Sequence, residues 1–165
     1  MTLAPTQTEK LARARGDLRL GLPIVLAGGG QAIIAAAVET LSPDRLQALR
    51  GLGPLVLALT ARRAETLKAR AYDGDVARIA VPEAVGLEWL GAVADPADDL
   101  RVPMKGPLAS HRTGDAALHR AAIQLAKAAQ LLPAVLTVDL AEGLAFAAQQ
   151  GLTFLTLTDC SDLFR

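Results

Sequence analysis

Apolar residues follow two patterns along this chain, one typical of amphipathic helices and one typical of short buried strands. Apolar positions three or four residues apart predict helices, and compact apolar runs closed by turn residues predict strands. Helices are expected near residues 6–20, 43–51, 60–70, 84–93, 115–132 and 141–150. Strands are expected at 23–27, 32–38, 54–59, 76–81, 134–138 and 152–157, with a closing helical turn at 159–164. This irregular order favours an α/β (α+β) domain, in which helices flank a mixed sheet, over a βαβ series or a helical bundle.

Capping residues mark the start of two of these helices. Thr6 and Glu9 have the spacing of a capping box, and Ser42 followed by Pro43 is a favourable helix start. The basic side chains of the 60–70 helix are interpreted as a solvated face, and only secondarily as an anion site.

Three consecutive glycines, residues 28–30, separate the first two predicted strands. A dinucleotide-binding fingerprint needs a further glycine where Ile33 stands, and a P-loop needs a Gly-Lys-Ser/Thr sequence that is absent here. Phosphate loops also usually lead into a helix, whereas residues 32–38 are predicted to be a strand. The glycines are therefore interpreted as a hairpin turn.

Length and composition narrow the class of protein. A chain of 165 residues fits one domain spanning residues 1–165, and 17 basic residues balance 17 acidic ones, so charge indicates neither nucleic acid nor an anionic membrane as a partner. Aromatic residues make up only 3%, which makes a base-stacking surface improbable. Cys160 is the single cysteine, and no apolar run has the length of a membrane span. We therefore expect a cytoplasmic protein.

The histidines and most acidic residues give weak signals. His111 and His119 lack nearby cysteines or paired carboxylates, so they form no recognisable zinc set and are interpreted as surface or capping residues. The acidic group of Asp95, Asp98 and Asp99 lacks calcium-loop spacing and is interpreted as a solvated turn.

Asp139 is more informative, because it follows the apolar strand at 134–138. Open α/β sheets tend to place functional groups at the carboxyl ends of their strands. Capping of the following helix explains this carboxylate about as well. The residues alone therefore give no convincing catalytic set.

Both ends of the chain resemble 3,4-dihydroxy-2-butanone 4-phosphate synthase, a riboflavin-pathway enzyme that often precedes GTP cyclohydrolase II in one polypeptide. At the front, residues 14–30 (ARGDLRLGLPIVLAGGG) and 38–67 are similar to the opening helix, first strand and following helix-strand-helix segment of that family. At the back, residues 101–114, 121–140 and 143–165 are similar to the approach to its Arg-x-Gly-His-Thr-Glu motif and to the elements that follow. The resemblance implies the synthase fold and a homodimer.

The sequence departs from the family where its chemistry lies. An acidic loop, whose carboxylates serve a magnesium ion and the acid-base steps on ribulose 5-phosphate, is replaced by residues 27–32 (AGGGQA). The His-Thr-Glu motif falls on residues 118–120 or on residues 115–117, depending on the register, and neither register restores it. Asp139 alone keeps a carboxylate at the position of the strand-end glutamate of the family.

The resemblance therefore predicts a catalytically degenerate synthase-like domain with a structural, dimerising or regulatory role and with no metal or cofactor. It implies a GTP cyclohydrolase II domain beyond Arg165, because the zinc cysteines and arginine motifs of that enzyme are absent from this chain. An alternative is a divergent enzyme that binds a sugar phosphate or nucleotide, and a third interpretation is a small-ligand sensor. The enzymatic alternative would use Asp139, His111 and Arg112, with Lys105 as a further ligand contact and His119 as a second remnant histidine.

Overall fold

The structure is a computed structural model that describes residues 2–71, 74–99, 108–111 and 114–164. Its strands are β1 (Ile24–Gly28), β2 (Gln31–Ala37), β3 (Val56–Thr60), β4 (Val76–Ala80), β5 (Ser110–His111), β6 (Ala134–Asp139) and β7 (Phe154–Thr156). Its helices are α1 (Gln7–Arg19), α2 (Pro43–Arg50), α3 (Ala61–Thr66), α4 (Leu87–Ala94), α5 (Ala117–Ala128) and α6 (Gly143–Gln150). Three 3-10 turns, η1 (Val38–Thr40), η2 (Pro96–Asp98) and η3 (Ser161–Phe164), complete the described elements.

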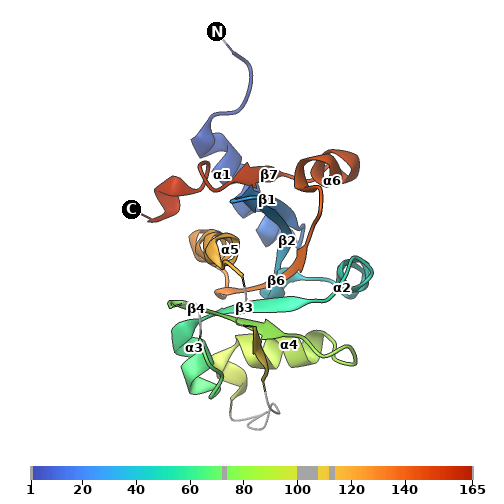
Figure 1. Ribbon diagram of the computed structural model, residues 1–165, viewed down its shortest axis with the longest axis vertical. Coiled ribbons are helices and arrows are strands. Elements are labelled where there is room, and N and C mark those ends of the chain that lie inside the picture. The colour runs from blue at the N-terminus through green and yellow to red at the C-terminus, as the bar shows by residue number, and fades with distance from the viewer. Residues whose placement is uncertain (1, 72–73, 100–107, 112–113, 165) are drawn as a thin grey trace.

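The strands described form one mixed sheet with the order β5-β4-β3-β6-β2-β1-β7 (Figure 1). β1 and β7 are parallel, and the other neighbouring pairs are antiparallel. β6, which comes late in the chain, is inserted between β2 and β3. The predicted mixed sheet with flanking helices is confirmed.

Apolar side chains cover both faces of this sheet, because helices pack on each side. Ile34 and Ala36 of β2 belong to the core shared with α2, α4 and α6, whereas Ile33, Ala35 and Ala37 belong to the core shared with α1 and α5. Successive side chains of a strand point to opposite faces, so a strand covered on both faces needs an almost continuous apolar run. This requirement explains why the second apolar run of the sequence is a strand.

The glycine segment forms the predicted hairpin turn between β1 and β2. Gly28 pairs with Gln31, which leaves Gly29 and Gly30 as a two-residue loop with φ of 60° and 77°. Two consecutive positive φ angles are the requirement of a type I′ hairpin turn, and glycine adopts them at little cost. A Cβ on Gly28 would lie 2.5 Å from the Cδ1 atom of Leu157. Backbone conformation or close packing therefore explains why each of these three positions is a glycine.

The predicted helix starts are also confirmed. At the first turn of α1, the Thr6 hydroxyl accepts from the Glu9 amide at 3.2 Å, and the Glu9 carboxylate accepts from the Thr6 amide at 2.9 Å. At the start of α2, the Ser42 hydroxyl accepts from the Arg45 amide at 3.2 Å, with Pro43 in the first helical turn. These caps satisfy amides that a helix leaves without internal partners.

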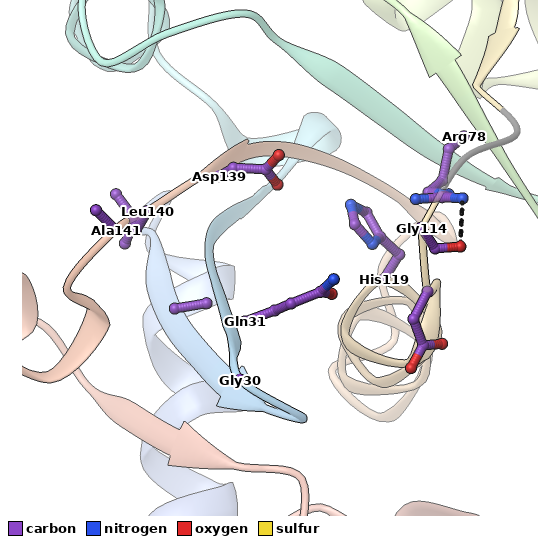
Figure 2. A pocket seen from close by; sticks show the side chains of 10 residues that line it. Gly30, Gln31, Arg78, Gly114, His119, Asp139, Leu140 and Ala141 are labelled. Atoms are coloured by element: carbon purple, nitrogen blue, oxygen red, sulfur yellow. Dashed lines mark hydrogen bonds between the residues drawn. The ribbon is translucent and has the colours of Figure 1, made fainter.

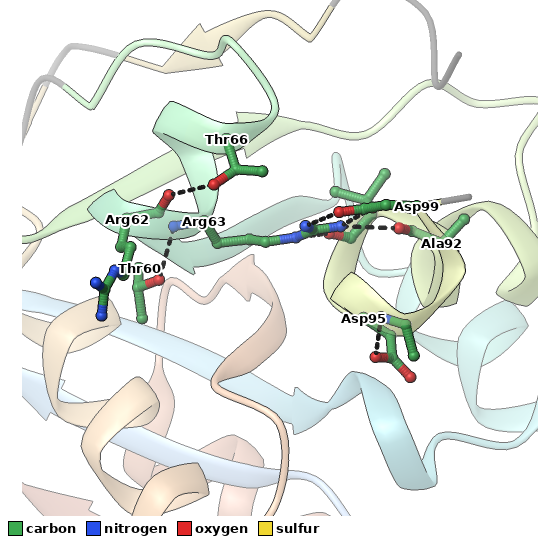
Figure 3. Close-up of polar contacts among 9 residues, drawn as sticks. Thr60, Arg62, Arg63, Thr66, Ala92, Asp95 and Asp99 are labelled. Carbon is green, nitrogen blue, oxygen red and sulfur yellow. Dashed lines mark hydrogen bonds and ion pairs between the residues drawn. The ribbon is translucent and has the colours of Figure 1, made fainter. Parts of the chain in front are cut away.

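The basic helix is shorter than predicted and does not form a fully solvated face. α3 ends at Thr66, and Lys68 beyond it has a φ of 60°. Arg63 is buried, and its guanidinium forms a two-bond ion pair with Asp99 at 2.8 and 2.9 Å (Figure 3). It also donates to the carbonyls of Val93 at 2.8 Å and Ala92 at 3.2 Å.

The three neighbouring aspartates were interpreted as a solvated turn. This interpretation is wrong for Asp99, which forms an ion pair with the buried Arg63. Val93 and Ala92 lie in the last turn of α4, where carbonyls lack partners within the helix and a cation is favourable. Arg63 thus joins α3 to the carboxyl end of α4 and to the turn that follows it.

No helix among the described residues is both long and apolar enough to cross a membrane.

Candidate functional site

A pocket of about 390 Å³ opens where the β1–β2 turn, the end of β6 and the start of α5 meet (Figure 2). Its walls carry cationic, acidic and neutral polar side chains as well as backbone. The lining residues are Gly30, Gln31, Ala32, Arg78, Gly114, Asp115, His119, Asp139, Leu140 and Ala141.

The strand register places the polar side chains on one face of the sheet. Asp139 pairs with Ile33 across β6 and β2, and Gln31 lies two residues before Ile33 on β2. Ile33 faces the core under α1 and α5, so alternation puts Gln31 and Asp139 on the face where α5 lies. The Leu140 amide continues the ladder by donating to the Ala32 carbonyl at 2.9 Å.

His119 is one of two predicted site residues that the described structure brings together, the other being Asp139. It lies in the first half of α5 and is 5% exposed, so its interpretation as a surface or capping residue is wrong. α5 packs closely on the sheet and buries His119 as well as Leu118 beside it. The buried face of this helix therefore includes a polar residue as well as apolar ones. In Figure 2 the side chains of His119, Gln31 and Asp139 point toward the same space.

Arg78 is a charged pocket residue that the sequence alone did not single out, and Gln31 and Asp115 are two further polar ones. Arg78 stands in the middle of β4 and is only 5% exposed, although it carries a guanidinium. One of its nitrogens donates to the Gly114 carbonyl at 3.4 Å, at the segment that leads into α5. The available signal was a single arginine inside the apolar run VARIAV, residues 76–81.

The donor set of the pocket does not fit the magnesium ion that the synthase resemblance implies. Asp139 is an exposed carboxylate, and Asp115 already accepts from the Ala117 amide at 3.0 Å in the segment that leads into α5. A hard divalent cation prefers several oxygen ligands and tolerates a neighbouring cation such as Arg78 poorly. Within the part of the chain that the structure describes, no three His, Cys, Asp or Glu side chains gather as a metal site.

The remaining predicted residues are less well placed or lie outside the described ranges. His111 is in the edge strand β5, where it pairs with Arg78 of β4. Arg112 and Lys105 lie outside the described residues. Their proposed role as ligand contacts therefore stays a prediction.

Cys160 is unsuited to act as a nucleophile. It is fully buried in the core shared with α1 and α5, and this burial raises the pKa of its thiol to about 11, with the neighbouring Asp159 adding to the rise. A cysteine nucleophile needs an accessible thiolate.

Comparison with known proteins identifies the fold and a distant relative. No family model matches the sequence. The chain is 30% identical over 141 residues to GTP cyclohydrolase-2 of Azospirillum brasilense, a match that covers 83% of this chain and 36% of the relative. It thus spans about a third of the length of that curated relative.

Solved structures show the same fold over nearly the whole chain. The 3,4-dihydroxy-2-butanone 4-phosphate synthase of Candida albicans superposes with a TM-score of 0.67 at 16% identity, covering 94% of this chain and 97% of that one. A two-domain 3,4-dihydroxy-2-butanone 4-phosphate synthase from A. baumannii gives a TM-score of 0.63 at 17% identity, covering 90% of this chain and 56% of that one. The chain therefore has the 3,4-dihydroxy-2-butanone 4-phosphate synthase fold and is distantly related to a cyclohydrolase-named protein, as the sequence resemblance predicted.

Proposed function

We propose that this chain, which has the synthase fold, is a non-catalytic synthase-like domain that serves a structural, dimerising or regulatory role in a GTP cyclohydrolase II-type protein of the riboflavin pathway. The observation that carries this proposal is the turn between β1 and β2. Its loop consists of Gly29 and Gly30 alone, and the ladder resumes at once with Gln31. The resemblance places the metal-binding carboxylates of active synthases in the loop after the first strand, where this chain has no acidic side chain.

The shape of the turn strengthens this interpretation. A type I′ turn of two glycines is an unstrained hairpin connection. The two glycines therefore connect β1 to β2 without any additional loop residues. The carboxylates that do line the pocket, Asp115 and Asp139, come from the start of α5 and the end of β6. Neither replaces a group that would act from the turn.

The direct test is turnover of ribulose 5-phosphate in the presence of Mg²⁺. We expect no dihydroxybutanone phosphate to form above the rate without protein, whereas the Candida albicans synthase, assayed in parallel, provides the positive control. Product formation that scales with the concentration of the chain would contradict the proposal.

We further infer that the chain forms a homodimer and is the N-terminal part of a longer protein whose cyclohydrolase domain follows it. The relative from Azospirillum brasilense, of which the match covers 36%, supports the second inference. Sedimentation velocity measures the first, and a monomer at micromolar concentration would exclude it. Reading the coding sequence past Arg165 for cysteines at zinc spacing tests the second.

A second candidate function is a divergent enzyme acting on a sugar phosphate or a nucleotide. The observation in its favour is that Asp139 and His119 line the same pocket of about 390 Å³, a volume within the usual range of small-molecule sites. It would use Asp139 with His111 and Arg112, and with Lys105 as a further ligand contact. Turnover of a phosphorylated substrate that is lost on Asp139→Asn would favour this candidate over the first.

A further inference from the structure

We propose that the pocket binds a small oxyanion directly through the Arg78 guanidinium, with His119 as a second contact and without a metal ion. The inference goes beyond the proposed function, because anion binding at this pocket can be tested whether or not the domain is catalytic. It starts from the mismatch between the pocket and a divalent cation. The pocket beside the turn where the resemblance implies a metal ion is also lined by the guanidinium of Arg78.

Arg78 has the position that such a contact needs. It comes from the middle of β4, with a strand on each side, so its backbone is held by the sheet. Its side chain lies on the sheet face that carries Val76 and α5, and it lines the pocket while being 5% exposed. A guanidinium in such a sheltered position interacts more strongly with an anion than one in water, and its planar fork matches an oxyanion.

The pocket has a cationic end at Arg78 and an acidic end at Asp139. His119 is as deeply buried as Arg78 and lines the same wall, which also includes the start of α5. The amino end of α5 already has a negative charge beside it, because the Asp115 carboxylate accepts from the Ala117 amide at 3.0 Å, so the attraction for an oxyanion comes from the side chains of Arg78 and His119. Asp139 extends from the end of β6 at the opposite side of the pocket, as Figure 2 shows. An oxyanion is therefore expected at the Arg78 end, away from the Asp139 carboxylate.

Replacing Asp139 distinguishes direct binding of the anion by Arg78 from binding through a metal ion, because the two models predict opposite changes in anion affinity. If a metal ion joined an anion to the protein, the Asp139 carboxylate would hold the metal, and Asp139→Asn would abolish anion binding. If Arg78 binds the anion directly, the same substitution removes a repulsive charge and leaves binding unchanged or tighter.

Isothermal titration calorimetry with inorganic phosphate, and separately with malonate, tests the proposal at constant ionic strength set with NaCl. At least one of the two anions should bind with 1:1 stoichiometry, and EDTA should leave its affinity unchanged. Arg78→Gln should weaken this affinity by about tenfold or more, since a charge-assisted pair is lost. Arg78→Lys should give a smaller loss, because it keeps the charge but not the fork.

Arg62→Gln is the matched control, because it removes the same charge from an exposed position on α3. Circular dichroism and a thermal melt of Arg78→Gln and Arg78→Lys show whether each variant is folded, and Asp139→Asn provides a second test that leaves Arg78 in place. The proposal is overturned if neither anion saturates the protein, if binding needs Mg²⁺, if Arg62→Gln loses as much affinity as Arg78→Gln, or if Asp139→Asn abolishes binding. Absence of binding would leave the proposed non-catalytic function standing, and turnover of ribulose 5-phosphate would overturn that function while leaving anion binding intact.

Discussion

The ion pair between Arg63 and Asp99 should contribute measurably to the stability of the fold. We expect Asp99→Asn to destabilise the domain, because Arg63 then stays buried with its charge uncompensated. The Arg63 side chain is 8% exposed and the Asp99 side chain is 33% exposed, and the two bonds between them measure 2.8 and 2.9 Å. Asp99 lies after α4 and Arg63 in α3, so the pair joins segments that are 36 residues apart.

The size of this effect follows from the burial of the two partners. Breaking a buried pair by removing one charge costs about 3–5 kcal/mol, and a hydrogen bond to a charged group contributes about 1.5–3 kcal/mol. The Asp99 side chain is 33% exposed to water, and an asparagine would still accept one bond from Arg63. We therefore expect Asp99→Asn to lower the free energy of unfolding by about 2 kcal/mol, within the smaller of these two ranges. For a domain of this size, that loss lowers Tm by about 4–8 °C.

A double-mutant cycle separates the pair from the packing of the arginine stem. Urea unfolding of wild type, Asp99→Asn, Arg63→Met and the double variant should give a coupling free energy of about 1–2 kcal/mol. Arg62→Met, on the exposed side of the same helix, should change the free energy of unfolding by less than about 0.5 kcal/mol. A coupling energy near zero, or an Asp99→Asn variant as stable as wild type, would refute the reasoning.

Three further predictions concern the hairpin, the first helix cap and the buried thiol. Gly29→Val should destabilise the β1–β2 turn by about 1–2 kcal/mol in urea unfolding, because its φ of 60° is unfavourable for a β-branched residue, and Gly16→Val is the control for the loss of a glycine without positive φ. Hydrogen bonds from Thr6 lower the pKa of Glu9 in the folded state, so the stability that this carboxylate contributes is present above its unfolded pKa and is lost as the pH falls through the lower folded value. Glu9→Gln should flatten the acid side of the stability curve measured by thermal melts between pH 2 and 7, and an unchanged curve would exclude this contribution. Burial raises the pKa of Cys160 to about 11, so Ellman's reagent at pH 8 should modify it only at the rate of unfolding, and rapid labelling of the native protein would contradict its burial.

The parts of the fold that the sequence predicted are those decided by local interactions. The Thr6–Glu9 cap, the Ser42–Pro43 helix start and the glycine hairpin depend on residues within four positions of one another. The strands were predictable because burial on both faces demands continuous apolar runs. The order of strands was not predictable, because the insertion of β6 between β2 and β3 depends on contacts between distant segments.

The residues whose surroundings were predicted wrongly are polar groups that the tertiary structure buries. Arg63 and Asp99 each looked like a solvated charge, since nothing near either one in the sequence identifies the other as its partner. His119 looked like a surface histidine, because its burial depends on how closely α5 approaches the sheet. Charge patterning along a helix describes one element at a time, and it cannot reveal a partner supplied by another element.

This difference changes where the chemistry of the domain should be sought. The three glycines that first suggest a phosphate loop are each explained by backbone geometry or by contact with Leu157, so they require no ligand. Arg78 is the opposite case, because its neighbours in β4, Ala77 and Ile79, are fully buried apolar residues, and an apolar side chain at its position would avoid the cost of burying a charge. A buried charge beside a pocket, inside an otherwise apolar strand, is the kind of local conflict that functional sites show. The pocket beside Arg78, rather than the glycine turn, is therefore where ligand binding should be tested.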